Sequence, residues 1–351
     1  MRVDYYELRD IYKSEINKNV KNKKRLYKFE LKREQYLLNM YNEIKNNTYN
    51  GGKYNLFLIY KPKLRVIMSQ SVYDKTINHY ITRTVLEPKL TKYLCDNNVA
   101  TRKGMGTSKG IELLKGYIEE NKKYDKFYFL KLDIKKFFYS IDHSVLKNLI
   151  KKDLDSDEYE MISRIIDSTN QEYINKTIEK LGNDLPKYEY GKGLPIGNLS
   201  SQFLAIFYLS RLHHYIIHNL HIKHVVIYMD DYILIHPNKE YLKEVLQIIE
   251  EKLNNEYKLE LNKSKTYIKS SNEGITFLGY NFKVINKKTI ITLTSDVKRK
   301  IRKNIKTTAY LISNDKISFK SAFSSINTIK YSYKYTNSKY IENTLDKYWY
   351  K

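Results

Sequence analysis

Two adjacent carboxylates stand in the middle of an apolar, strand-forming segment of the sequence. Asp230 and Asp231 interrupt the run Val-Val-Ile-Tyr-Met-Asp-Asp-Tyr-Ile-Leu-Ile at 225–235. Burying charge in such a segment is unfavourable unless a cation or hydrogen bonds offset it. A strand-turn-strand with the two aspartates at its apex would present them to a divalent metal. The pattern therefore favours phosphoryl-transfer chemistry.

A metal site for this chemistry needs a further carboxylate from another part of the chain. Two cations about 4 Å apart stabilise the attacking and the leaving oxygen, and neighbouring strand residues point to opposite faces. Asp133 is the best candidate, because it ends a second strong strand segment at 127–134. If this segment lies beside 225–235, Asp133 comes close to Asp230. The alternative is that Asp133 caps a helix and that Asp-Asp is a plain hairpin tip.

The composition indicates a polyanionic partner. The 351 residues include 63 Lys+Arg against 39 Asp+Glu, a formal net charge of +24. Such an excess is typical of proteins that bind nucleic acid. Cys95 is the single cysteine, which excludes a disulfide framework and a Cys-rich zinc site. With no apolar signal core and no apolar run that could span a bilayer, we expect a cytoplasmic protein without membrane contact.

The segments that must position the carboxylates alternate strands with helices, which favours an α+β fold. Strands are expected at 54–60, 64–68, 127–134 and 225–235, with short ones around 258–269 and 275–285. Helices are expected at 72–87, ending before Pro88, and at 144–167, 200–220 and 238–257. One or two basic helices are expected within residues 1–50, and more from about residue 295.

The acidic segments resemble those of bacterial retroelement reverse transcriptases, through Tyr-Met-Asp-Asp at 228–231 and Lys-Leu-Asp-Ile-Lys-Lys-Phe-Phe at 131–138. Further blocks follow in the order of that family. The blocks are 61–67 with Leu86-Glu87-Pro88, then 102–107, 133–143, 193–209, 263–265 and 277–280. Six blocks in order make the resemblance specific, and only residues 1–50 and those beyond about 290 lie outside it.

The resemblance implies a right-hand polymerase of the α+β class, with fingers, a palm built on an antiparallel sheet, and a helical thumb. The expected parts are basic N-terminal helices at 1–50, fingers at 51–125 joined by helices from 144–190, a palm at 126–285, and a basic helical thumb at 286–351.

In such an enzyme the carboxylates would hold two Mg²⁺ ions, for which Mn²⁺ is expected to substitute. The resemblance assigns Asp133 and Asp230 as the main ligands, with the carbonyl of Ile134 helping beside the nucleotide and Asp231 as the less direct third carboxylate. Hard oxygen ligands suit Mg²⁺. Lys265 matches the family position that protonates the leaving pyrophosphate, a general-acid role.

Three further positions would recognise the incoming deoxynucleotide. Lys61 and Arg65 flank a turn and would hold the triphosphate, for which the planar fork of Arg is suited. Phe138 follows Asp133 by five residues and would close off the ribose 2′ position, so that deoxynucleotides are selected. The resemblance also places Gly197 in the nucleotide pocket. Along the primer and template it places Arg102, Gly104, Tyr228, Met229 and Gly279.

The fourth block departs from the commonest form of the family. Most members carry Gln-Gly and then Ser-Pro, whereas this chain has Ile196 for the Gln and Gln202 for the Pro. This form resembles the reverse transcriptases of diversity-generating retroelements, which copy a template RNA with frequent errors opposite adenine. An aliphatic Ile196 cannot hydrogen-bond the incoming sugar and base, so the penalty for a misplaced pair would fall.

The expected partners are a template RNA, which a structured noncoding RNA could supply, the cDNA product, dNTPs and a small basic accessory protein. One alternative is an antiphage-defence or other unclassified bacterial reverse transcriptase directed by a noncoding RNA. A more remote alternative is a non-catalytic RNA-binding protein on the same scaffold. All of these would bind nucleic acid in a salt-sensitive manner.

Overall fold

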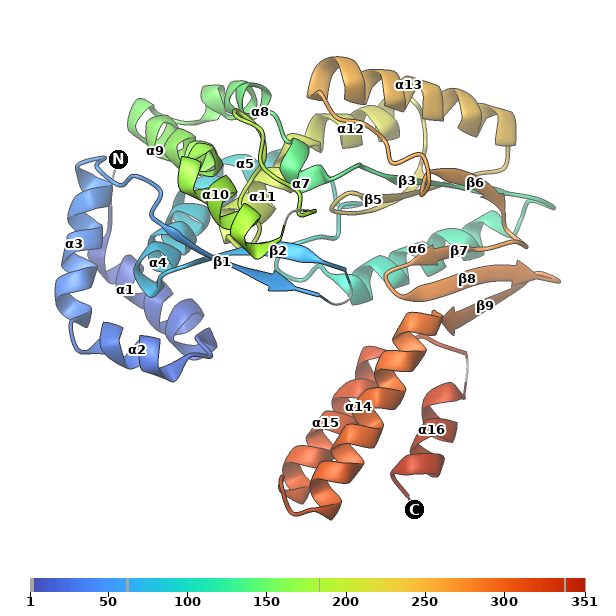
Figure 1. The fold of residues 1–351 in the computed structure, drawn as a ribbon. Coiled ribbons are helices and arrows are strands. Elements are labelled where there is room, and N and C mark those ends of the chain that lie inside the picture. The colour runs from blue at the N-terminus through green and yellow to red at the C-terminus, as the bar shows by residue number, and fades with distance from the viewer. Residues whose placement is uncertain (1–2, 61–62, 183, 338, 351) are drawn as a thin grey trace.

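A four-stranded antiparallel sheet forms the centre of the molecule. A computed structural model describes residues 3–60, 63–182, 184–337 and 339–350 (Figure 1). The strand order is β4-β5-β3-β6. The bounds are β3 Tyr128–Asp133, β4 His224–Tyr228, β5 Asp231–His236 and β6 Tyr267–Ser270. The strong strand signals at 127–134 and 225–235 are therefore confirmed, and they lie next to each other in one sheet.

Alternating side chains give this sheet two buried faces. Phe129 and Ile233 point into one apolar cluster, which α6 (Thr107–Asn121) and a second sheet complete. Leu130 and Leu234 point into the other, which includes α13 (Lys239–Tyr257). In Figure 1, α13 and α6 lie on opposite sides of the sheet. A strand that is buried on both faces has an almost continuous apolar sequence. The aspartates at the end of such a strand are therefore conspicuous in the sequence.

The second sheet has the order β7-β8-β9, with bounds Ile275–Phe277, Tyr280–Ile285 and Lys288–Leu293. The strand β9 was not predicted. Its hairpin turn uses Asn286 and Lys287, both at positive φ, where Asn-Gly would have been the recognisable signal. The expected palm–thumb boundary at 285/286 falls inside this hairpin, and the first helix beyond it begins at Ser295.

A two-stranded hairpin, β1 (Tyr54–Ile59) and β2 (Arg65–Gln70), projects from the centre. Its inner face packs Tyr54, Val66 and Met68 against α10. The helices around the hairpin and the central sheet are α7 Phe137–Ser140, α8 His143–Ile150, α9 Ser156–Ile166, α10 Glu172–Leu181, α11 Leu199–Tyr208 and α12 Ser210–His218.

Three of the expected helices differ from the structure. The segment 144–167 is divided into α8 and α9 by a 3-10 turn at Lys151–Asp153 and the extended Leu154. The helix from α4 (Val72–Ile81) continues past Pro88, because a π-helical segment at Thr82–Leu86 is followed by α5 (Glu87–Leu90). Pro88 thus lies in a first turn, where its missing N–H is tolerated. The single helix expected at 200–220 is interrupted at Leu209 (φ −97°, ψ 3°), which separates α11 from α12.

Basic helices stand at both ends of the chain, as expected. The N-terminal ones are three rather than one or two, α1 Tyr5–Ile11, α2 Lys23–Glu30 and α3 Arg33–Lys45. The C-terminal ones form a separate bundle of α14 Ser295–Ser313, α15 Phe319–Ser332 and α16 Tyr340–Tyr348 (Figure 1). None of the described helices has the length and apolar character needed to cross a bilayer.

Candidate active site

The three predicted carboxylates meet at one end of the central sheet. β3 and β5 are antiparallel, and their register places Asp133 opposite Asp231. Tyr228 pairs with Asp231 across the β4–β5 hairpin, so Met229 and Asp230 form the turn. Met229 adopts the left-handed region at φ +58°. Asp231 is the residue in register with Asp133. The charge of Asp133 also acts on Asp230, which agrees with the expected proximity of these two acids.

Lysine side chains hold the two outer carboxylates. Nζ of Lys265 lies 3.0 Å and 2.9 Å from the two carboxylate oxygens of Asp133. The amide of Asn262 donates a further hydrogen bond to Asp133 at 3.1 Å. Nζ of Lys131 donates to Oδ2 of Asp231 at 3.2 Å. Each of these acids is therefore partly neutralised by a side chain of the protein.

Burial raises the pKa values of the two adjacent acids, Asp230 and Asp231. Burial raises the pKa of Asp230, and the nearby charge of Asp133 adds to this rise. Burial also raises the pKa of Asp231, to about 6, although Lys131 opposes it. Oδ1 of Asp231 is buried and accepts no hydrogen bond of good geometry, although Nζ of Lys131 lies 3.2 Å from it. An additional cation would relieve both effects.

The donor chemistry fits a divalent ion, but the ligands are not gathered around one point. Within the described residues, no group of three or more His, Cys, Asp or Glu side chains is arranged to hold a metal ion. The carboxylates of Asp133 and Asp231 instead contact the ammonium groups of Lys265 and Lys131. Hard carboxylate oxygens are the ligands that Mg²⁺ prefers. A bound ion would have to take the place of at least one lysine contact.

The loop of the fourth block lies beside the Phe138 turn. The N–H of Leu194 donates to the carbonyl of Phe138 at 2.7 Å, and the N–H of Met68 donates to the carbonyl of Ile196 at 2.9 Å. Phe138 and Ile196 are both half-buried, whereas Phe137 is in the core. These bonds join strand β2, the fourth-block loop and the chain just after Asp133.

Gly197 allows this close approach. It has φ +135°, and a Cβ at this position would lie 2.8 Å from the carbonyl oxygen of Met68. Any other residue would therefore push the loop away from β2. Gln202 lies half-buried on α11, one turn after the loop.

Cationic side chains of the β1–β2 hairpin reach the acids. The charge of Arg65 lowers the pKa of Asp230 against the effect of burial. The pKa of Lys63 is lowered, chiefly by its contact with Lys265 and then by burial. Lys61, which was predicted in this role, lies outside the described residues.

Two of the predicted primer and template positions lie in the loop that precedes α6. The guanidinium of Arg102 donates to the backbone carbonyls of Cys95 and Asn98, so it supports this loop. Gly104 is exposed at φ +77°, and nothing lies within 4 Å of a Cβ built there. The free space around Gly104 leaves room for another molecule.

The other predicted primer positions lie beside the acids and in the turn between β7 and β8. Tyr228 and Met229 are half-buried beside Asp230. Gly279 has φ +87°, and a Cβ there would lie 2.9 Å from the side chain of Val297 at the start of α14. Its small size thus serves the contact between the second sheet and the thumb helix.

Sequence reasoning missed Lys131, Asn262 and Lys63. Lys131 had a usable signal, because residues two apart on a strand share a face and Lys131 precedes Asp133 by two. Asn262 and Lys63 had none, since each reaches the acids from a loop whose position depends on the whole fold.

Comparisons with known proteins agree with this geometry. The family model described as reverse transcriptase (RNA-dependent DNA polymerase) matches residues 44–282. Among solved structures, apo telomerase from Candida tropicalis aligns at 16% identity and TM-score 0.51, over 85% of this chain and 58% of that one. Telomerase from Candida albicans, in complex with a fragment of telomeric RNA, aligns at 14% identity and TM-score 0.48, over 86% and 60%.

The chain spans about three fifths of the length of these two telomerase chains. No curated protein sequence matches it. The family match covers well over half of the residues, and the C. tropicalis structure has the same fold. The chain therefore belongs to the reverse transcriptase family and has its α+β right-hand polymerase fold.

Proposed function

We propose that the protein is an RNA-directed DNA polymerase that makes cDNA by two-metal nucleotidyl transfer. The observation that carries the proposal is the register of β3 and β5, which brings Asp133 and Asp231 opposite each other with Asp230 in the adjoining turn. Carboxylates from separate segments of the chain are what such a reaction requires. The family match supports the same activity.

Asp133, Asp230 and Asp231, with the carbonyl of Ile134, are the residues that would hold two Mg²⁺ or Mn²⁺ ions. When bound, the ions would activate the primer 3′-hydroxyl and stabilise the leaving pyrophosphate. The burial of Asp231, which raises the pKa of this carboxylate although Lys131 lies beside it, supports this assignment, because a bound cation would offset that burial. Lys265, whose Nζ lies 2.9 Å from Asp133, would donate a proton to the pyrophosphate.

The incoming dNTP would lie between the acids and the β1–β2 hairpin. Arg65 and Lys63 would bind its triphosphate, together with the predicted Lys61. The ring of Phe138, held by the contact of its carbonyl with Leu194, would exclude a ribose 2′-hydroxyl. Template RNA and the cDNA strand complete the proposed set of partners.

Primer extension on an RNA template tests the activity. Asp133→Ala and Asp230→Ala should abolish Mg²⁺-dependent extension, while Asp125→Ala, an exposed aspartate just before β3, should extend normally. Thermal unfolding of each variant checks that it is folded. Extension that survives either active-site substitution would refute the proposal.

Nucleotide selection is tested at Phe138. Phe138→Ala should lower the preference for dNTP over rNTP by roughly 10- to 200-fold, the range for a steric contact in a pocket. Phe138→Tyr keeps the ring and should keep the preference. An unchanged preference in Phe138→Ala would show that another group reads the sugar.

Within this activity we propose the error-prone enzyme of a diversity-generating retroelement. The aliphatic Ile196 and the Gln202 of the fourth block support this subclass. Ile196→Gln should lower errors opposite template adenine, measured by sequencing the cDNA, and an unchanged error spectrum would count against it. Sequencing the RNA that copurifies would separate a diversifying template from the noncoding RNA of a defence enzyme.

A further inference from the structure

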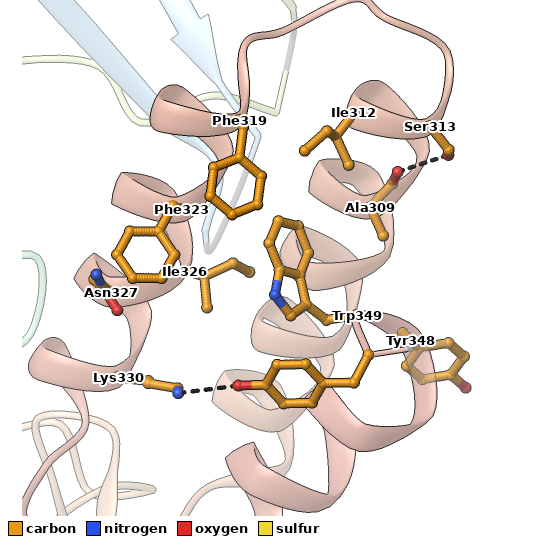
Figure 2. Close-up of a pocket in the computed structure, with 11 residues that line it drawn as sticks. Ala309, Ile312, Ser313, Phe319, Phe323, Ile326, Asn327, Lys330, Tyr348 and Trp349 are labelled. Atoms are coloured by element: carbon orange, nitrogen blue, oxygen red, sulfur yellow. Dashed lines mark hydrogen bonds between the residues drawn. The ribbon is translucent and has the colours of Figure 1, made fainter.

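The C-terminal bundle contains an open aromatic hollow between its three helices (Figure 2). The hollow has a volume of about 520 Å³. Phe319 and Phe323 of α15 line one side, and Trp349, which follows α16, lies across from Phe323 and below Ile312 of α14 in Figure 2. Lys330 donates a hydrogen bond to the hydroxyl of the neighbouring Tyr350 at 3.4 Å. We call these lining residues the thumb hollow.

The aromatic rings of the thumb hollow face solvent. Phe319 is 67% exposed and Phe323 is 51% exposed. Their rings are stacked, with centroids 5.9 Å apart and an interplanar angle of 18°. Exposed, parallel aromatic faces of this kind are suited to receive a further flat ring. The stability of the bundle does not explain them, because its own core is made by Ile301, Ile305 and Ile326.

A row of cations leads along α14 to this hollow. Arg299, Arg302, Lys303 and Lys306 are all exposed. Their spacing of three and four residues puts them on one face of the helix, where they line a shallow depression of about 420 Å³. We call them the α14 stripe. Nζ of Lys306 lies 4.5 Å from the ring centroid of Tyr348, which also lines the thumb hollow.

The cations of the α14 stripe and the aromatic rings of the thumb hollow together indicate which kind of molecule would bind there. None of the described residues that line the stripe or the hollow is acidic. Asp296, one turn before the stripe, pairs with Arg299, and the three further cations of the stripe favour an anion. The hollow requires flat, apolar rings attached to that anion. A single-stranded nucleic acid has both, whereas the bases of a duplex are already stacked on each other.

We propose that the thumb binds a single strand of nucleic acid, with phosphates along the α14 stripe and a base stacked in the thumb hollow. The inference rests on the proposed function, since the strand would be template or product outside the acid site. The thumb would thus contact the nucleic acid at a second place, where it binds an unpaired base without taking part in the chemistry.

The only tryptophan of the chain, Trp349, lies in the thumb hollow, so its fluorescence reports on this place. The full-length protein is titrated, without primer or dNTPs, with a single-stranded oligothymidylate of about 16 nucleotides, long enough for one binding site. Base stacking should quench the fluorescence. An abasic oligonucleotide of the same length should bind through the stripe and leave the fluorescence unchanged.

Substitutions in the hollow should weaken binding of the oligothymidylate. Phe323→Ala should raise the dissociation constant by about 5- to 150-fold, the range measured when one stacking ring is removed. Phe323→Tyr keeps a stacking face and should bind like the unchanged protein. Tyr190→Ala is the matched control, because Tyr190 is an 89% exposed aromatic outside the thumb.

The proposal is overturned if the abasic strand quenches Trp349 equally, if neither strand quenches it, or if Phe323→Ala binds as tightly as Tyr190→Ala. Self-association that Phe323→Ala abolishes, without base-dependent quenching, would assign the hollow to a second copy of the chain. Primer extension on the same preparations separates the two proposals. Quenching without extension contradicts the polymerase, and extension without quenching contradicts the thumb site.

Discussion

The palm and the thumb place charge in opposite ways. In the palm, acids lie partly buried at the end of a sheet that is apolar on both faces, and lysines from distant segments pair with them. In the thumb, cations and aromatic rings lie at the surface without a lining acid, and Arg299 of the α14 stripe pairs with Asp296. The first arrangement is suited to chemistry on a bound group, and the second to reversible binding of a long polyanion.

This difference has consequences for mutation. A palm residue works in a fixed, desolvated position, so removing it should change the reaction or the fold by several kcal/mol. A thumb residue contributes one of several similar exposed contacts, so its removal should change affinity moderately and leave the fold intact. The following experiments test this contrast, from the largest expected effect to the smallest.

Among these further experiments, the largest effect is expected at Lys265. Lys265→Met removes the proposed proton donor, so the extension rate should fall by roughly 10²- to 10⁴-fold, the usual contribution of a general acid. It also removes the ammonium group that now contacts Asp133, so Mg²⁺ should bind more tightly in calorimetry. Lys263→Met, an exposed neighbour, is the control. Weaker Mg²⁺ binding in Lys265→Met would contradict this account.

Aromatic residues of the two regions should differ in their effect on stability. Phe137→Ala empties a core position and should lower the free energy of unfolding by about 3–5 kcal/mol. Phe323→Ala removes an exposed ring and should change it by less than about 0.5 kcal/mol. Chemical denaturation measures the free energy of unfolding of both variants. Equal losses of stability would contradict the proposed difference between palm and thumb.

Acid should destabilise the palm through His213. This residue is fully buried, and Nε2 lies 2.8 Å from the hydroxyl of Tyr232. Burial lowers the pKa of His213 to about 3, so the folded protein favours the neutral ring. Its contribution is intact above the ordinary pKa near 6.5 and is lost as the pH falls below it, by about 2 kcal/mol at pH 5.

The comparison of the unchanged protein with His213→Gln measures this contribution, because Gln keeps a hydrogen-bonding group and does not titrate. Unfolding free energies are recorded from pH 7.5 to 5. The variant should lose less stability in acid than the unchanged protein. Parallel curves would show that His213 does not titrate between the folded and unfolded states.

The smallest effect is expected at single cations of the α14 stripe. Arg302→Ala and Lys303→Ala should each weaken binding of a single strand modestly and reduce the slope of log K against log salt by about 1, as one phosphate contact is lost. Lys283→Ala, on the second sheet, should keep the slope. A slope that stays unchanged in all three variants would show that the α14 stripe does not contact the strand.

Much of the palm could be predicted from local sequence. The apolar segment 127–134 forms a strand and 225–235 forms a strand-turn-strand, as predicted, and their adjacency follows from the chemistry that three acids require. Helix ends were less predictable. The π-helical segment at 82–86 and the break at Leu209 depend on how α4 and α11 pack on their neighbours. No local residue pattern predicts either feature.

The sequence by itself determined the kind of chemistry, because Asp133, Asp230 and Asp231 are carboxylates within strand signals, in the order of a known family. Only the tertiary structure decided which groups surround them. Lys265 reaches Asp133 across 132 positions of sequence, and Asp133 lies in register with Asp231 while its charge also acts on Asp230. The thumb hollow likewise exists only where three helices meet. Such contacts depend on packing between distant segments, whereas sequence patterns report the local preference of each segment alone.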